Sequence, residues 1–351
     1  MEISTIRGVD IQMHKKQKTV FVTGAEGFLG RYTTRAFHKA GWCVVGLGHA
    51  TLPAGEHTKW GMEHMFHGDI SPMLLTSAFD GYGAPDLLIH AAGASSVRQA
   101  ASNPYAELAL TVGSTAAVAD FIRQYASGCT LIYISSAAVY GCEWREAIPI
   151  SAATNPISVY GLHKHMSEQL ILGAGAIYGL QHKIVRYFSL YGPGQSKQLL
   201  WDVLRRVNNG EQPLELGGNG EETRDFLYVK DAANLLIALA HAGNDVPTIV
   251  NGGTGTATTI SEMVKLLLLE QGGGTDFYFT GQVRHGDPRD LVADISCLQS
   301  LPLYSPAWSL QAGVRAYVDW VKQRIYNDTI VGAYDVKLGS LRLNTEQGGT
   351  I

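Results

Sequence analysis

A glycine-rich loop between an apolar stretch and an amphipathic one most restricts how this 351-residue chain can fold. Residues 18–23 are β-branched and apolar, which predicts a buried strand. Gly24, Gly27 and Gly30 follow, and a helical stretch continues to Lys39. In such a strand–loop–helix unit, glycines permit a tight turn, let a pyrophosphate approach the backbone, and let the helix pack closely on the strand. The unit therefore predicts a dinucleotide-binding α/β fold, although its spacing differs by one residue from G-x-G-x-x-G.

After this loop the sequence alternates between short apolar runs and helical stretches. This alternation predicts a parallel sheet covered by helices on both faces. The expected fold class is α/β, a Rossmann-type doubly wound parallel sheet. We expect strands at 42–47, 65–70, 86–91, 130–135 and 183–190, with helices at 104–125 and 157–173.

The second half has a different texture, with helical stretches separated by glycine-rich turns. Helices are expected at 198–209, 230–241, 259–270 and 310–326, and a strand at 247–251 could return to the main sheet. The smaller C-terminal part would be an α/β substrate domain, with the substrate site in the cleft between the two domains. The expected division is an N-terminal extension at 1–17, an NAD(P)-binding Rossmann domain at 18–190, a mainly substrate-binding domain at 191–325 and a flexible tail at 326–351.

Composition excludes several classes of function. Hydrophobic residues make up 46% of the chain and charged residues 17%, as in a protein with a large buried core. A net charge of −4 gives no electrostatic case for nucleic acid or an anionic membrane. No apolar run approaches the roughly 20 residues of a membrane span, and residues 1–18 lack the apolar core of a signal peptide. The four scattered cysteines suggest neither disulfides nor a metal site, so we expect a cytoplasmic protein without a metal.

Tyr160 and Lys164 are four residues apart on an expected helix, which places them on one face. A free phenol titrates near ~10 and is a poor base at neutral pH. A neighbouring ammonium favours the phenolate, so the pair could take a proton from an alcohol. This spacing is common on helix surfaces, so its meaning depends on the rest of the chain.

Five motifs occur in one order along the chain. They are the glycine loop, Ser135-Ser136-Ala-Ala-Val-Tyr140-Gly, Tyr160-x-x-x-Lys164, Arg186-Tyr-Phe-Ser-Leu-Tyr-Gly-Pro-Gly194 and Arg224-Asp-Phe-Leu-Tyr-Val-Lys-Asp231. Together they resemble the extended short-chain dehydrogenase/reductases, the nucleotide-sugar epimerase/dehydratase family, over residues 18–325. The segment around Ser136 is most similar to UDP-hexose 4-epimerases.

This resemblance implies roles for individual residues. Tyr160 would move the proton on a sugar oxygen, Lys164 would lower the pKa of Tyr160 and bind the nicotinamide ribose, and Ser136 would bond the reacting oxygen. The implied substrate contacts are Ser136, Ser189, Arg224 and Arg284. The implied cofactor contacts are Gly24, Gly27, Phe28, Leu29, Gly30, Asp69, Ile70, Ala91, Ala92, Gly93, Tyr160 and Lys164.

The chain departs from the family pattern at several positions. Gly48 stands where the family has the acid that holds the adenosine ribose, so NAD is the expected cofactor but NADP stays open. Thr111 and Ser189 stand where asparagine is common, which puts the identity of the substrate in doubt. Ala137 and Ala138 follow the catalytic serine, where the family's dehydratases have Asp-Glu and its decarboxylases keep a glutamate. Neither alanine can transfer a proton, which disfavours elimination and decarboxylation.

Three functions follow from these residues. The leading one is an NAD(P)-dependent nucleotide-sugar 4-epimerase acting through transient oxidation at C4. The alternative is an NADPH-dependent nucleotide 4-keto-6-deoxysugar reductase, which Gly48 favours, and the third is a non-catalytic NAD(P)-sensing protein. The expected partner is a nucleotide-diphosphate sugar. The resemblance also implies a homodimer formed through helices 104–125 and 157–173.

Overall fold

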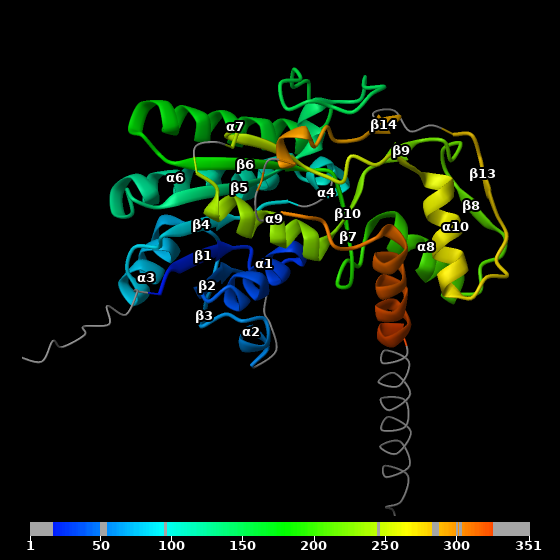
Figure 1. Ribbon diagram of the computed structural model, residues 1–351, viewed down its shortest axis with the longest axis horizontal. Helices are drawn as coiled ribbons and strands as arrows, with labels where there is room; N and C mark the ends of the chain where they lie inside the picture. The colour runs from blue at the N-terminus through cyan, green and yellow to red at the C-terminus, as the bar shows by residue number, and fades with distance from the viewer. Residues whose placement is uncertain are drawn as a thin grey trace, which may run out of the picture.

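A seven-stranded parallel sheet forms the centre of the first half of the protein (Figure 1). The computed structural model describes residues 17–49, 55–94, 97–243, 246–282, 288–299, 301 and 304–325. The strand order is β11-β6-β5-β4-β1-β2-β3, so the chain changes direction across the sheet between β1 and β4. This is the predicted Rossmann-type fold, in which ligands bind at such a switch point. The strands are β1 Thr19–Thr23, β2 Cys43–Gly48, β3 His64–His67, β4 Leu87–His90, β5 Thr130–Ser136, β6 His182–Tyr187 and β11 Ile249–Gly252.

Helices cover both faces of this sheet because its strands are apolar on both sides. In β1, the side chains of Val20 and Val22 join one core cluster and that of Phe21 joins the other. The first cluster contains residues of α1 and α9, and the second contains residues of α3, α6 and α7. These helices are α1 Phe28–Lys39, α3 Pro72–Tyr82, α6 Ser114–Tyr125, α7 Val159–Tyr178 and α9 Val229–His241, with the shorter α2 Glu56–Lys59, α4 Val97–Ser102 and α5 Pro104–Leu108 between them.

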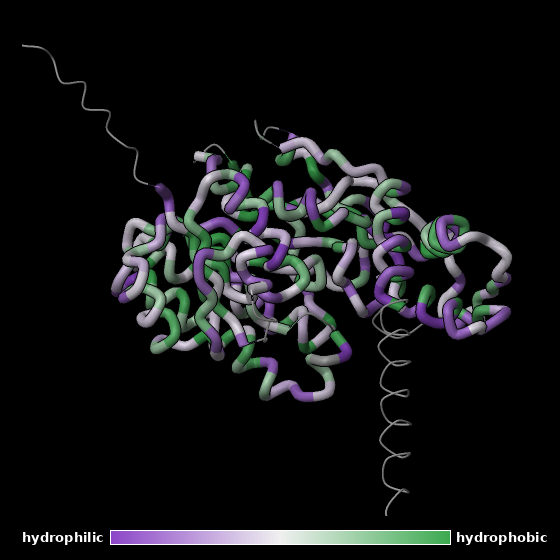
Figure 2. Tube along the Cα trace, turned by 90° about the horizontal axis from the view of Figure 1, so that it is seen from below, coloured by the Kyte–Doolittle hydropathy of each residue, from purple (hydrophilic) through white to green (hydrophobic). Residues whose placement is uncertain are grey.

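The second half of the chain builds a separate core. Buried residues of α8, α10 and the helix at 310–325 pack together there with residues of three short strands. Along the helices in Figure 2, hydrophobic and hydrophilic residues alternate, as expected where one side packs and the other faces water. The elements are β7 Ser189–Tyr191, α8 Gln198–Asn208, β8 Leu214–Leu216, β9 Thr223–Arg224, β10 Phe226–Tyr228, β12 Thr258–Thr259, α10 Ile260–Gln271, β13 Phe277–Phe279 and β14 Asp290–Leu291.

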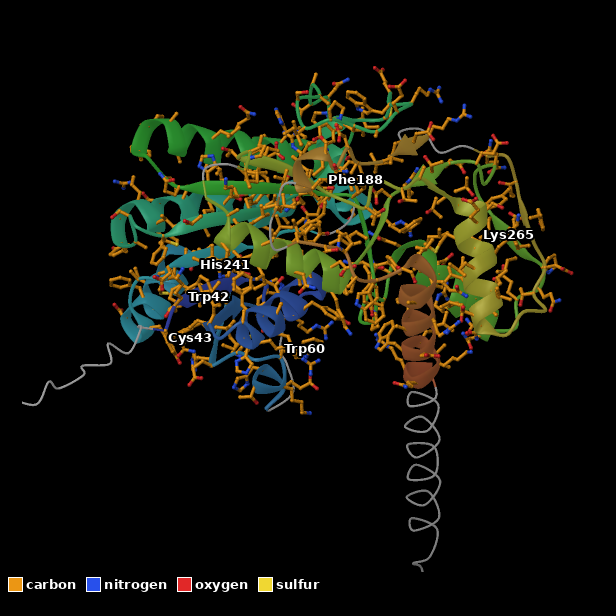
Figure 3. The ribbon with its side chains drawn as sticks, viewed as in Figure 1. Trp42, Cys43, Trp60, Phe188, His241 and Lys265 are labelled. Atoms are coloured by element: carbon orange, nitrogen blue, oxygen red, sulfur yellow. The ribbon has the colours of Figure 1, made fainter. Side chains whose placement is uncertain are left out.

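Strand β11 and helix α9, from the second half of the chain, pack with the large sheet and its helices. Strand β11 pairs with β6 at the edge of the large sheet, and α9 packs against α1. Figure 3 shows His241, at the end of α9, close to Trp42, just before β2, and their rings meet edge to face with centroids 6.3 Å apart. The cofactor-binding body therefore uses residues from both halves of the chain.

The structure corrects three expected elements. The helix expected at 104–125 is interrupted by a π-helical turn, Ala109–Gly113, which inserts one extra residue per turn between α5 and α6. The strand expected at 65–70 ends at His67, because Gly68 has φ +153° and Ser71 caps α3. The strand expected at 183–190 divides into β6 and β7, and β7 pairs with β10 instead of continuing in the large sheet.

Some expectations fall outside the described residues. The N-terminal extension, apart from Gln17, lies there, as do the expected tail at 326–351 and Arg284. None of the helices in the described ranges has both the length and the apolar character needed to cross a membrane.

Candidate active site

The loop after β1 lies at the switch point of the sheet. Gly24 has φ +66°, and a Cβ on it would lie 2.9 Å from the backbone of Ala91. This loop therefore contacts the segment Ala91–Gly93 that follows β4. Gly27 precedes α1, and within the described residues no side chain caps the helix there. The first amides of α1 can accordingly receive an anion such as a pyrophosphate.

Buried polar side chains at the ends of β1 and β4 hold the loop after β1 and the segment Ala91–Gly93 together. Thr23 Oγ1 lies 2.7 Å from His90 Nδ1 and accepts a hydrogen bond from the amide of Ala92 at 3.2 Å. Burial, with a smaller effect of the Lys164 charge, lowers the pKa of His90 to about 3. The imidazole is therefore neutral at physiological pH and acts as a fixed hydrogen-bonding group between β1 and β4.

The expected cofactor residues lie at one edge of the sheet. Gly24, Gly27, Phe28, Leu29 and Gly30 follow β1, Asp69 and Ile70 follow β3, and Ala91, Ala92 and Gly93 follow β4. Because parallel strands all end at the same edge, these segments line a single surface. The residues present thus fit a dinucleotide: a tight loop, an open helix N-terminus and a second close backbone segment.

Ser136, Tyr160 and Lys164 meet at the same edge, beyond β5. Ser136 ends β5, and its Oγ accepts a hydrogen bond from the amide of Ala138 at 3.2 Å. Tyr160 lies in the first turn of α7, which Ser158 caps by accepting from the amide of Gly161 at 3.1 Å. A Cβ on Gly161 would lie 2.5 Å from the carbonyl oxygen of Ala138, so the glycine lets α7 approach the turn that contains Ser136.

The electrostatics of this group are dominated by burial. Burial raises the pKa of the Tyr160 phenol, and a hydrogen bond with the Ser136 side chain lowers it. The Lys164 ammonium donates to the carbonyl of Ile134 at 2.9 Å and lies 5.0 Å from the centre of the Tyr133 ring. Burial lowers the pKa of Lys164 to about 8, against an opposing effect of the Glu168 carboxylate. For Tyr160, burial outweighs the hydrogen bond with Ser136, so the pKa of the phenol lies above its ordinary value.

Replacing Lys164 by methionine should stabilise the cofactor-free protein at pH 7. The folded-state pKa of about 8 lies below the ordinary value of 10.5, so removing the buried ammonium should gain on the order of 2–3 kcal/mol. Below pH 8 the lysine is protonated in both the folded and unfolded chain, and the gain is complete. Between pH 8 and 10.5 the folded chain loses its proton first, so the gain should shrink. Urea denaturation of both proteins from pH 7 to 10 measures this; a gain that grows with pH would contradict it.

A buried ion pair fixes α7 against the sheet beside these residues. Glu168, one turn beyond Lys164, accepts hydrogen bonds from Arg186 Nε at 3.0 Å and Nη2 at 2.6 Å. Ser135 Oγ donates to the same carboxylate at 2.5 Å. Ser135 is thus a link between β5 and α7, while the neighbouring Ser136 lies beside the tyrosine.

Thr111 holds the segment after β4 in place of the family's usual asparagine. Its hydroxyl accepts from the amide of Ala94 at 3.3 Å and donates to Glu107 at 2.6 Å. The second carboxylate oxygen of Glu107 contacts Nδ1 of His163, one turn beyond Tyr160 on α7. The shorter threonine thus contacts the amide of Ala94 directly and is linked to α7 through Glu107. Thr111 lies in the π-helical turn and is buried. Neither Glu107 nor His163 was expected at the site from the sequence.

The expected substrate residues are more dispersed. Ser189 begins β7, two residues after Tyr187 ends β6. Because Tyr187 pairs with Ser136, Ser189 lies at the same edge as Ser136. Arg224 lies in β9, in the small sheet β12-β9-β14, and its Nη1 donates to the carbonyls of Thr223 at 2.8 Å and Arg289 at 3.3 Å. Asp225 next to it is buried and accepts from the amides of Thr254, Gly255 and Ala293. The Arg-Asp-Phe motif thus organises the loops of the second half.

The fold and the site define a short-chain dehydrogenase/reductase type of protein, with a switch-point glycine loop and a Tyr–Lys pair on one helix. A sequence profile of the NAD dependent epimerase/dehydratase family matches residues 20–253. The chain belongs to this family.

Relatives and solved structures match nearly the whole chain. A putative UDP-glucose 4-epimerase of Methanocaldococcus jannaschii is 26% identical over 312 residues, which are 86% of this chain and 98% of the relative. CDP-paratose 2-epimerase of Salmonella typhi is 27% identical over 332 residues, with 86% and 98% covered. The crystal structure of UDP-glucuronic acid 4-epimerase from Bacillus cereus, in complex with UDP-glucuronic acid and NAD, has a TM-score of 0.78 at 25% identity and covers 87% of this chain and 99% of its own.

Proposed function

We propose that this chain is an NAD-dependent nucleotide-sugar 4-epimerase. The observation that carries this proposal is the grouping of Ser136, Tyr160 and Lys164 beside the switch-point loops, with alanines at 137 and 138. A hydroxyl, a phenol and an ammonium can move one proton at one carbinol, and Ala137 and Ala138 carry no acid to expel water. The names of the relatives support the same substrate class.

The residues would divide the reaction as follows. NAD, when bound, supplies the chemistry of taking a hydride from the carbinol carbon and returning it to the opposite face. Tyr160 would have to be a phenolate for this step, a form that burial disfavours and the Ser136 hydrogen bond favours. It would accept the hydroxyl proton while the carbon is oxidised and return the proton when the ketone is reduced. Ser136 donates a hydrogen bond to the reacting oxygen, where charge develops. Lys164 Nζ lies 3.7 Å from the position that a Cβ on Gly93 would take, which suits a contact with a cofactor bound along this segment.

The proposal also assigns residues to substrate binding and helices to a dimer interface. Ser189 at the sheet edge would contact the sugar, with Arg224 and Arg284 on the diphosphate side. A homodimer through α5, α6 and α7 is supported by apolar side chains exposed on each of these helices, since Tyr105 is 83%, Tyr125 45% and Leu162 45% exposed. Such side chains suit a helical interface.

A 4-keto reductase is the second candidate, because Gly48 removes the family's usual acid from the end of β2. The two reactions differ in what happens to the cofactor. An epimerase regenerates it in every cycle and can retain it, whereas a reductase must release it after each turnover.

Two measurements test the proposal. The purified protein should release NAD on denaturation, as identified by mass spectrometry. Incubated without added cofactor, it should invert one carbon of a UDP-, CDP-, dTDP- or GDP-sugar, and NMR should locate that carbon at C4. Recovery of NADP(H) alone, together with turnover only when NADPH and a 4-keto sugar are supplied, would establish the reductase instead.

A further inference from the structure

Glu26 is an acidic residue inside the glycine loop, between Gly24 and Gly27. Its side chain is only 2% exposed, and its Oε1 lies 3.4 Å from Nδ1 of His67 at the end of β3. A carboxylate is seldom buried in a loop without a role, because removing its charge from water costs free energy. The loop's anion-binding amides do not require an acid at this position.

The carboxylate of Glu26 lies over the end of β2. Strands β1 and β2 are neighbours, with Thr23 paired to Leu47, and the amide of Gly24 donates to the carbonyl of Leu47 at 2.7 Å. A Cβ built on Gly48 would lie 2.4 Å from Oε2 of Glu26. The carboxylate thus occupies the space in which a side chain at residue 48 would begin. Glu26 can take this position only because residue 48 is glycine.

The end of β2 is where dinucleotide-binding sheets present a carboxylate to the 2′-hydroxyl of the adenosine ribose. Here the acid is missing from the strand, but a carboxylate reaches the same place from the preceding loop. His49 and Asp69 face each other at the same edge, 3.8 Å apart, with both side chains largely exposed. Glu26 is instead held in place by burial, which suits a recognition group with one geometry.

We infer that Glu26 selects NAD over NADP, supplying from the glycine loop the carboxylate that the family otherwise places at residue 48. It accepts hydrogen bonds from the ribose hydroxyls and repels a 2′-phosphate. This inference deepens the proposed function by naming the residue that sets its cofactor, and it removes the reason for which Gly48 favoured a reductase. It concerns binding, so it holds or fails independently of which sugar is turned over.

The test compares binding of NAD and NADP to the full-length protein freed of carried-over cofactor. Calorimetry on the wild type should give tighter binding of NAD. Glu26→Gln keeps the shape of the side chain and removes its charge, so the NAD-over-NADP ratio should fall by about 10-fold or more, as expected for a charged hydrogen bond and a lost repulsion. Glu63→Gln removes an exposed acid before the start of β3, at the opposite edge of the sheet, and should leave the ratio unchanged.

Two further variants separate recognition from simple damage to the loop. Gly48→Ala keeps Glu26 but places a methyl group against its carboxylate, so the ratio should fall in the same direction. Glu26→Ala/Gly48→Asp returns the acid to the strand end and should restore the preference for NAD. An unchanged ratio in Glu26→Gln, or equal affinities in the wild type, would overturn the inference. A wild-type protein that prefers NAD but turns over no nucleotide sugar would instead count against the proposed reaction.

Discussion

Replacing Tyr160 by phenylalanine should lower kcat by at least about 10³-fold, since the site would lose the group that we propose moves the substrate proton. The phenol lies in the first turn of α7 and interacts with Ser136. Removing one oxygen leaves the helix and its Ser158 cap unchanged, so the fold should persist. Rates would be measured with whichever nucleotide sugar the wild type inverts, and NAD binding by calorimetry. The expected result is lost turnover with NAD affinity within about 3-fold of the wild type, less than 1 kcal/mol.

Tyr178→Phe is the matched control for this variant. Tyr178 ends the same helix and is 62% exposed, far along α7 from Ser136. Its replacement makes the same chemical change and should leave kcat unaltered. Equal activity of Tyr160→Phe and Tyr178→Phe would contradict the proposed proton transfer.

Breaking the buried pair of Glu168 and Arg186 should produce the largest loss of stability. The Arg186 side chain is 5% exposed and that of Glu168 is fully buried, so removing either charge leaves the other buried without its partner. Glu168→Gln should reduce the free energy of unfolding by about 3–5 kcal/mol. Urea denaturation at pH 7 measures this difference.

An exposed pair provides the comparison. Arg123 and Asp120 form an i,i+3 ion pair with side chains 43% and 49% exposed, so Asp120→Asn should change stability by no more than ~0.5 kcal/mol. The double variant Glu168→Leu/Arg186→Met should lose less than the sum of its single variants, because it leaves no buried charge unpaired. Similar losses for Glu168→Gln and Asp120→Asn would show that the buried pair does not fix α7 to the sheet.

The parallel sheet was predictable from sequence because each strand is a short apolar run. The helical stretch after each strand shows the spacing of apolar residues that is typical of a helix. The position of the candidate catalytic group was predictable for a related reason. Once Ser136 ends a strand and Tyr160 begins the next helix, the topology of a parallel sheet brings both to one edge. Local sequence and topology therefore determine this part of the molecule together.

Contacts between distant segments were not predictable. Neither the π-helical turn at Ala109–Gly113 nor the contact between Glu107 and His163 on another helix was expected from the sequence. From the sequence, Gly48 indicated only a missing acid. The approach of the Glu26 carboxylate to Gly48 depends on the pairing of β1 with β2 and could not be read from the sequence. Burial likewise could not be read from the Tyr160–Lys164 spacing, so nothing in the sequence indicated that burial raises the pKa of Tyr160.

The return of β11 to the large sheet has a consequence for how this family can vary. The chain leaves the cofactor-binding body after β6 and returns to it with α9 and β11. It leaves again with α10, returns with the segment that holds Leu298 and Leu301, and leaves once more with the helix at 310–325. No single cut separates the two bodies. Recombination between relatives that exchanged sugar preference would have to splice three separate segments at once. Drift of residues within each segment is a simpler route to a new substrate than the exchange of modules.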